Sequence, residues 1–195
     1  MLLGLTGGIA TGKSTVSRIL RDRTGIPFFD ADACVHDLLA TDADIAATVQ
    51  REFALPEAPI ERRTLGNMIF RDPEARRRLE AILHPAVREK WQAMAAECRA
   101  GNRDFLADIP LLFETGANTV FDTTVVVAAS SAIQRQRLAG RGVEPETIEG
   151  MLASQWPIGQ KVALADDVIW NDGSLAELER QCELLLDALF PTRHE

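Results

Sequence analysis

The sequence predicts an α/β fold of three layers, in which a five-stranded parallel sheet lies between helices on both faces. Strand-like and helix-like segments alternate along the chain, which favours parallel strands joined by crossover helices. The valines at 125–127 show no polar alternation, as in strands buried on both faces. The first apolar run also passes through a glycine-rich loop directly into a helical segment.

The predicted strands are short apolar segments at residues 2–6, 26–29, 105–109, 123–129 and 168–170. A loop at residues 7–12 and a helix at 13–23 follow the first strand, and Gly25 ends that helix. Asp30 follows the second strand, and Pro110 stops the third. In such sheets ligands bind beyond the carboxyl ends of the strands, so the loops there are the first place to look for a site.

From residue 31 to about 100 the pattern is almost wholly helical, punctuated by prolines at 56, 59, 73 and 85. This region is too long for one crossover helix, so we expect a helical insertion at 31–102. The last segment is amphipathic, and Ser174 and Glu177 are spaced as a capping box at its start. We therefore predict one structural unit over residues 1–195, with its core at 1–30, 103–141 and 166–195.

Composition restricts the possible partners. The formal net charge is −8, whereas a nucleic-acid binder is usually basic, so we expect no nucleic-acid partner. Three cysteines without metal-ligand spacing are typical of reduced, cytoplasmic thiols. No apolar run approaches the roughly 20 residues that span a bilayer, and the N-terminus has no signal-peptide pattern, so we expect no membrane partner.

A phosphate-binding loop is the most specific motif. Gly7 to Ser14 matches G-x-x-x-x-G-K-[ST] at every fixed position, between a strand and a helix. Glycines let the backbone curl so that N–H groups face phosphate oxygens, and the helix N-terminus adds partial positive charge. Lys13 would reach the β- and γ-phosphates, and Ser14 would offer its hydroxyl to Mg²⁺. The candidate ATP-binding residues here are Gly8, Ile9, Ala10, Thr11, Gly12, Lys13, Ser14 and Thr15.

The loop alone leaves kinases, GTPases and ATPases open. The sequence lacks the N-K-x-D element that reads guanine. A kinase also needs an acceptor site, a group that orients the acceptor hydroxyl, and arginines that neutralise the transferring charge.

Asp30 and Asp32 are candidates for the orienting group, since they follow the second strand. They could hold Mg²⁺ through water or accept a proton from a hydroxyl. Equally, one of them could simply cap the next helix. The local sequence leaves these alternatives open.

Arg137 and Arg141 are candidates for the mobile arginines. Four residues apart on a predicted helix, they would share a face, and glycines at 140 and 142 suggest a hinge. A lid at about 137–165 could then close over the phosphates and exclude water. The alternative is two solvated arginines on a helix surface.

Taken in order, these motifs resemble the dephospho-CoA kinase family over nearly the whole chain. The matching segments are Gly4–Ile9, Thr11–Val16, Asp30–Asp32, Arg62–Leu65 with Ile69–Phe70, Leu79–Arg88, Asp108–Glu114, Gln134 with Arg137 and Arg141, and Ala165–Gly173. Taken singly, only the phosphate loop and the H-P-A-V-R segment at 84–88 are specific motifs; the other segments are informative through their order along the chain. In the phosphate loop, Ala10 and Thr11 replace the commoner Gly-Ser, which matters only if φ at Ala10 must be positive.

The resemblance implies the fold of a P-loop NTPase kinase and the phosphorylation by ATP, with Mg²⁺, of the ribose 3′-hydroxyl of dephospho-CoA. It implies that Asp32 orients that hydroxyl and that Lys13, Arg137 and Arg141 are catalytic. Acceptor-binding residues would be Asp32, Arg62, His84 and Arg88, with the insertion as the CoA-binding part. Asn171 and Gly173 would lie near adenine, and from its position Asp108 could assist Mg²⁺ through water, as could Asp32.

Two other functions stay possible at this stage: another small-molecule kinase on the same scaffold, and a P-loop regulatory protein that hydrolyses slowly. We expect a monomer or weak homo-oligomer.

Overall fold

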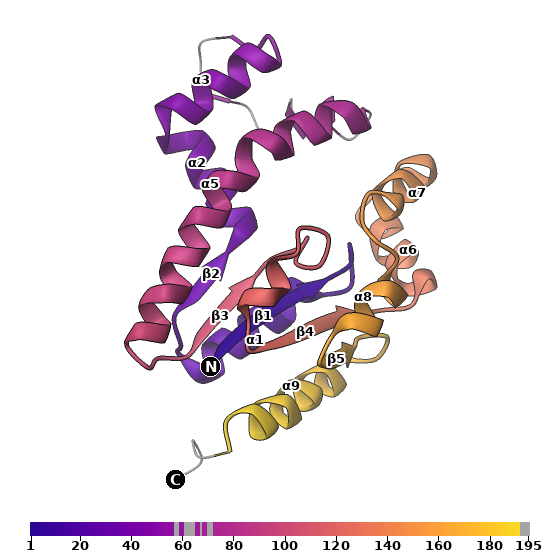
Figure 1. Ribbon diagram of the computed structural model, residues 1–195. Coiled ribbons are helices and arrows are strands. Elements are labelled where there is room, and N and C mark those ends of the chain that lie inside the picture. Colours follow the sequence, from indigo (N-terminus) through magenta and orange to yellow (C-terminus); the bar gives the residue numbers. More distant parts are fainter. Residues whose placement is uncertain (57–58, 61–64, 67, 70–71, 192–195) are drawn as a thin grey trace. The chain divides into compact units, whose positions relative to one another are not determined.

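The computed structural model describes residues 1–56, 59–60, 65–66, 68–69 and 72–191 (Figure 1). The chain divides into two compact units, one of Met1–Phe28 with Cys98–Glu195 and one of Phe29–Glu97. The boundaries drawn from the sequence for the insertion, 31 and 102, lie two and five residues further along the chain than 29 and 97.

The sheet has five strands in the order β2-β3-β1-β4-β5. They are β1 (Leu2–Gly7), β2 (Phe28–Asp30), β3 (Phe105–Asp108), β4 (Thr123–Ala128) and β5 (Asp167–Trp170). β1 pairs in parallel with β3 and β4, and β4 pairs in parallel with β5. The prediction of a five-stranded parallel sheet is confirmed, with strand bounds that differ by one or two residues.

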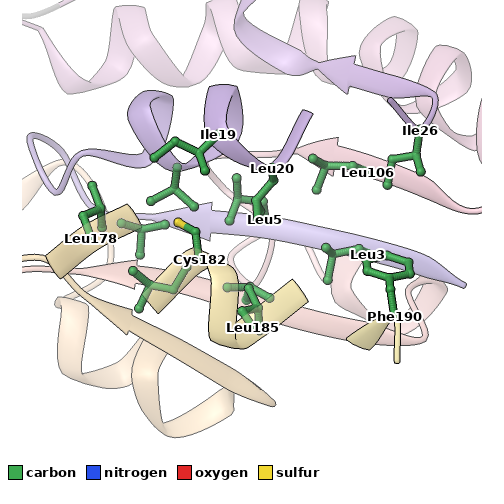
Figure 2. Packing of buried hydrophobic residues seen from close by; sticks show 14 residues of the cluster. Leu3, Leu5, Ile19, Leu20, Ile26, Leu106, Leu178, Cys182, Leu185 and Phe190 are labelled. Carbon is green, nitrogen blue, oxygen red and sulfur yellow. The ribbon is translucent and has the colours of Figure 1, made fainter. Parts of the chain in front are cut away.

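Burial explains the strand sequences. Val125, Val126 and Val127 of β4 are all fully buried, as their lack of polar alternation predicts. Two helices, α1 (Lys13–Thr24) and α9 (Leu175–Leu189), contact each other and cover β1 and β5. Figure 2 shows Ile19 and Leu20 of α1 packed with residues of β1 and α9 in one apolar cluster. This packing holds the start of α1, and with it the end of the glycine-rich loop, against the sheet.

The capping box predicted at the start of α9 is confirmed. The Ser174 hydroxyl accepts from the Glu177 N–H, and the Glu177 carboxylate accepts from the Ser174 N–H.

Three shorter helices precede β5: α6 (Ser131–Ala139), α7 (Pro145–Ala153) and α8 (Ile158–Leu164). A 3₁₀ turn, η1 (Ala117–Val120), precedes β4.

The second unit is helical, as predicted. It contains α2 (Ala31–Thr41), α3 (Ala43–Glu52) and α5 (Pro73–Ala100) up to Glu97. Its apolar cluster comprises Val49, Phe53, Leu65, Ala75, Leu79 and Leu83. Pro85 does not interrupt the helical pattern as expected: it lies inside the 28-residue helix α5. Packing of Leu79, Leu83 and Val87 on one buried face outweighs the hydrogen bond that proline cannot donate.

Among the described residues, no helix combines the length and the apolar character that a membrane span requires.

Candidate active site

The phosphate loop connects β1 to α1 through residues whose backbone requires glycine. A Cβ on Gly7 would lie 2.6 Å from the carbonyl oxygen of Val127, a backbone atom that cannot move aside. Gly12 has φ +94°, and a Cβ there would lie 2.2 Å from the Asn171 amide nitrogen. Ala10 adopts φ +59° without being glycine. The sequence predicted that alanine at position 10 affects the loop only if its φ is positive, and its φ is positive.

Three carbonyl groups of the loop accept hydrogen bonds from side chains of α6. Gln134 Nε2 donates to the Ile9 oxygen at 2.7 Å. Arg137 Nη1 donates to the oxygens of Ala10 and Thr11, each at 3.2 Å. The guanidinium of Arg137 is thus engaged with the outer side of the loop backbone.

Asn171, which follows β5, joins the same network. Its Nδ2 donates to the Thr11 oxygen at 2.7 Å, while its own carbonyl accepts from Arg137 Nη2 at 2.8 Å. Its side chain is buried, with 6% of its surface exposed. Gly8 is held within the loop, since the Thr11 hydroxyl donates to the Gly8 oxygen at 2.8 Å.

These contacts give successive loop carbonyls a donor on their outer side. In a trans peptide the N–H of the next residue points opposite to the C=O, so holding the carbonyls outward turns the N–H groups inward. An inward row of N–H groups at a helix N-terminus is an anion site. The loop is therefore organised for phosphate by side chains more than 120 residues away in sequence.

Lys13, the first residue of α1, forms an ion pair with Asp108 at the end of β3. The Asp108 side chain is almost fully buried, because β3 is a central strand of the sheet. A triphosphate that draws Lys13 away would leave this carboxylate beside the phosphates. The structure thus brings Asp108 together with Lys13 of the loop, and its role toward a cation stays a prediction.

Ser14 offers an exposed side chain in the first turn of α1. The described residues contain no group of three or more His, Cys, Asp or Glu side chains that could hold a metal. Mg²⁺ at phosphoryl-transfer sites is held by one or two protein groups, the phosphates and water, so a hydroxyl and one carboxylate suit that ion. The donor set here fits Mg²⁺ bound together with a triphosphate.

The structure corrects the prediction that Arg141 shares a helix face with Arg137. α6 ends at Ala139, and Gly142 has φ +75°, so the chain turns before the helix could reach Arg141. Arg141 lies exposed in this turn, and the described part of the chain provides no ion-pair partner for it. Arg137 and Arg141 therefore differ: the first is engaged with the loop and the second is free to meet a ligand.

Asp30 and Asp32, in the second unit, also have separate roles. The Asp30 carboxylate accepts from the Ala33 N–H at 3.0 Å and caps α2. Asp32 is exposed in the first turn of α2, beyond the cap. Capping is therefore the role of Asp30, which leaves the Asp32 carboxylate available for chemistry.

A family model described as dephospho-CoA kinase matches residues 1–177, about nine-tenths of the chain. The chain belongs to the dephospho-CoA kinase family. Two proteins named dephospho-CoA kinase illustrate the similarity. The one from Symbiobacterium thermophilum is 40% identical over 188 residues, which cover 93% of this chain and 78% of that protein. The one from Anaeromyxobacter dehalogenans is 42% identical over 191 residues, which cover 95% and 90%.

Several solved structures are also similar to this chain. TT1252 from Thermus thermophilus is 33% identical, with a TM-score of 0.77 and coverage of 97% of each chain. The dephospho-CoA kinase from Campylobacter jejuni is 26% identical, with a TM-score of 0.67 and coverage of 96% of each. A shikimate kinase from Bacteroides thetaiotaomicron, 14% identical with a TM-score of 0.56 over 97% of this chain and 98% of that one, shares the fold. The chain thus has the P-loop kinase fold, and as a member of the dephospho-CoA kinase family it is a phosphate-transferring enzyme.

Within this dephospho-CoA kinase fold, the residues expected to bind the acceptor lie in the second unit. His84 and Arg88 are one helical turn apart on α5, with His84 partly buried and Arg88 exposed. They flank the buried face that carries Leu83 and Val87. Arg62 lies outside the described residues.

The segment expected near adenine, Asn171 to Gly173, is tied to the sheet edge. The Asp172 carboxylate accepts from the Ser130 N–H at 2.7 Å, and this hydrogen bond lowers the pKa of Asp172. A Cβ on Gly173 would lie 2.3 Å from an oxygen of Glu177, so glycine leaves room for the capping box. Asn171 itself contacts the phosphate loop, as described above.

Two residues absent from the candidate list belong to this site. Gln134 matches the spacing of the family that the sequence resembles, and Lys161 of α8 stands where that resemblance leads us to expect an arginine, but neither was expected to be a site residue. Lys161 is fully buried and donates to the Gly7 oxygen. One signal was available, because Lys161 stands three residues after the apolar Ile158, at helical spacing on the inner face of α8.

Proposed function

We propose that this protein phosphorylates the ribose 3′-hydroxyl of dephospho-CoA with ATP, giving CoA and ADP, the last step of coenzyme A biosynthesis. The observation that carries the proposal is the preformed phosphate loop, whose carbonyls are held outward by Gln134, Arg137 and Asn171. Family membership supports the choice of acceptor.

Lys13 and the loop N–H groups bind the β- and γ-phosphates. The Lys13 ammonium is paired with Asp108 in the structure, and the ATP phosphates take over that charge. Ser14, with Asp108 or Asp32 acting through water, would hold Mg²⁺, which would supply positive charge that neutralises the phosphates.

Asp32 orients the acceptor hydroxyl and accepts its proton. The hydroxyl oxygen forms a bond to the γ-phosphorus, and the bond from that phosphorus to the β,γ-bridging oxygen breaks, so ADP leaves. Arg141 neutralises charge that develops on the transferred group, and Arg137 acts beside it while holding the loop. Positioning and charge account for most of the catalysis in such transfers.

The acceptor is held by Arg62, His84 and Arg88. Residues 31–102 form the CoA-binding insertion, and residues 137–165 form the lid that closes over the phosphates. The three cysteines are unpaired and buried, which supports a reducing, cytoplasmic setting. We propose a monomer or weak homo-oligomer.

The test is an acceptor assay. The purified chain is incubated with ATP, Mg²⁺ and one of dephospho-CoA, 3′-deoxy-dephospho-CoA, adenosine or shikimate, and ADP and the phosphorylated product are both measured. We expect product with dephospho-CoA alone, and none with its 3′-deoxy analogue. Equal or faster turnover of another acceptor would indicate a different small-molecule kinase. ADP release independent of any acceptor would indicate a regulatory P-loop protein.

A further inference from the structure

Lys161 is a fully buried charge that no part of the reaction above uses. Its ammonium donates to three oxygens: the Glu114 carboxylate at 2.8 Å, the Pro110 carbonyl at 2.8 Å and the Gly7 carbonyl at 3.4 Å. These acceptors come from the end of β1 and from the segment that follows β3.

Burying an ammonium group is energetically unfavourable unless acceptors and an opposite charge surround it. Moving an ammonium out of water costs several kcal/mol, which an opposite charge and further hydrogen bonds must offset. Burial lowers the pKa of Lys161, whereas the hydrogen bond and charge of Glu114 raise it. An apolar residue at this position would avoid the desolvation cost. Packing alone therefore does not explain why a lysine stands here.

The contact to Gly7 acts on the phosphate loop. Because the Gly7–Gly8 peptide is trans, anchoring the Gly7 oxygen directs the Gly8 N–H to the opposite side. Gly8 supplies the first of the N–H groups expected to face phosphate. Lys161 thus holds a carbonyl at the start of the loop, as Gln134 and Arg137 hold carbonyls in its middle.

The contacts to Pro110 and Glu114 act on the segment that follows Asp108. The Pro110 oxygen also accepts from the Thr6 hydroxyl at 2.9 Å, which ties this segment to β1. Asp108, the partner of Lys13, lies two residues before Pro110. One buried ammonium therefore connects the entry of the phosphate loop with the segment that directly follows Asp108, the ion-pair partner of Lys13.

We propose that Lys161 is a positioning residue for ATP: with Glu114 it fixes the Gly7–Gly8 peptide and the segment after β3, so that the loop is already shaped for phosphate before ATP arrives. Its side chain is enclosed by protein, so it would act on ATP through the loop backbone. The inference rests on the proposed function only in taking ATP as the ligand.

The test compares ATP binding with stability. The variants are Lys161→Met, Lys161→Met with Glu114→Gln, and Lys161→Arg; the matched control is Gln160→Met, an exposed position on the same helix. The double variant removes both charges, so it avoids a buried unpaired carboxylate. The Kd for ATP–Mg²⁺ is measured by calorimetry well below each unfolding midpoint, with the KM for ATP and for dephospho-CoA.

We expect the Kd and the KM for ATP to rise about tenfold in the double variant and at least as much in Lys161→Met, while the KM for dephospho-CoA changes less than twofold. Lys161→Arg keeps the charge but not the compact donor geometry, and should weaken ATP binding about threefold. Gln160→Met should bind ATP as the wild type does.

A purely structural lysine would lower the unfolding midpoint and leave the Kd for ATP unchanged in every variant that folds, which would overturn the proposal. If the Met variants do not fold, Lys161→Arg decides by the same criterion. Because ATP binding is measured without acceptor, a wild-type chain that binds ATP but fails to phosphorylate dephospho-CoA would refute the proposed function and leave this test intact.

Discussion

The carboxylate of Asp30 accepts a hydrogen bond from the backbone N–H of Ala33, at 3.0 Å, and so caps α2. This one contact distinguishes two aspartates whose roles the local sequence left open. Asp30 caps the helix, whereas Asp32 is exposed in its first turn and is the residue that we propose acts on the acceptor.

The first prediction separates these roles. Asp30→Ala should lower the free energy of unfolding by about 1 kcal/mol, the usual effect of losing an N-cap. Asp32→Asn should leave stability within about 0.5 kcal/mol yet reduce kcat roughly 10²–10⁴-fold, as when a general base is lost. Denaturant unfolding and steady-state kinetics on both variants measure this. Wild-type kcat in Asp32→Asn would remove Asp32 from the mechanism.

The second prediction concerns the ion pair between Lys13 and Asp108. Lys13→Ala should abolish measurable turnover, and it should also destabilise the protein by roughly 3 kcal/mol, because a buried carboxylate loses its ion pair with a lysine. Adding Asp108→Asn should restore most of the stability without restoring activity. A Lys13→Ala variant with full turnover would show that the loop does not bind the reacting phosphates.

The third prediction contrasts Arg137 with Arg141. Arg137→Ala removes donors from the Ala10 and Thr11 carbonyls, so ATP should bind about tenfold more weakly and stability should fall by about 1–2 kcal/mol. Arg137→Lys should not rescue it, since lysine lacks the planar fork. Arg141→Ala should keep stability and the Kd for ATP while kcat falls roughly 10²–10³-fold. Equal effects of the two alanine variants on Kd would contradict this division.

The fourth prediction uses the left-handed backbone of Ala10, φ +59°. Ala10→Gly relieves about 1–2 kcal/mol of strain, but the greater entropy of the unfolded chain opposes this by about 0.4–1 kcal/mol. The free energy of unfolding should therefore rise by 0 to about 1.6 kcal/mol. Ala10→Val should destabilise, because a branched side chain is not tolerated at this φ. Thermal or denaturant unfolding measures both, and a clear loss of stability in Ala10→Gly would contradict the interpretation.

The fifth prediction concerns Cys182, in the apolar cluster under the sheet. Burial raises the pKa of its thiol to about 11 from an ordinary 9.0. Since the folded state holds the proton more tightly, this contribution to stability is complete below pH 9 and is lost as pH rises from 9 to 11. Cys182→Ala should be less stable than wild type at pH 8, and that difference should shrink by about 1 kcal/mol at pH 10. Parallel unfolding curves for wild type and variant at pH 8 and 10 test this, and a constant difference would contradict it.

Local sequence was sufficient for much of the fold. The valine run of β4, the capping box of α9 and the strand–loop–helix around Gly7 to Ser14 each depend on neighbouring residues, so each could be predicted. Two expectations about helices were wrong, one because of packing and one because of a turn. Pro85 lies within α5 because its neighbours are buried on one face. Arg141 lies off α6 because the chain turns at Gly142.

The sequence by itself determined that a loop here can bind phosphate, since glycines, a lysine and a helix start are all contiguous. Only the tertiary structure decided how that loop is held. Gln134, Asn171 and Lys161 lie 125, 160 and 154 residues from the carbonyls they bind. The φ and ψ of a peptide can direct its N–H inward, but this orientation is kept only when the carbonyl oxygen has a hydrogen-bond donor. That donor comes from a distant element, which the packing of the sheet brings next to the loop.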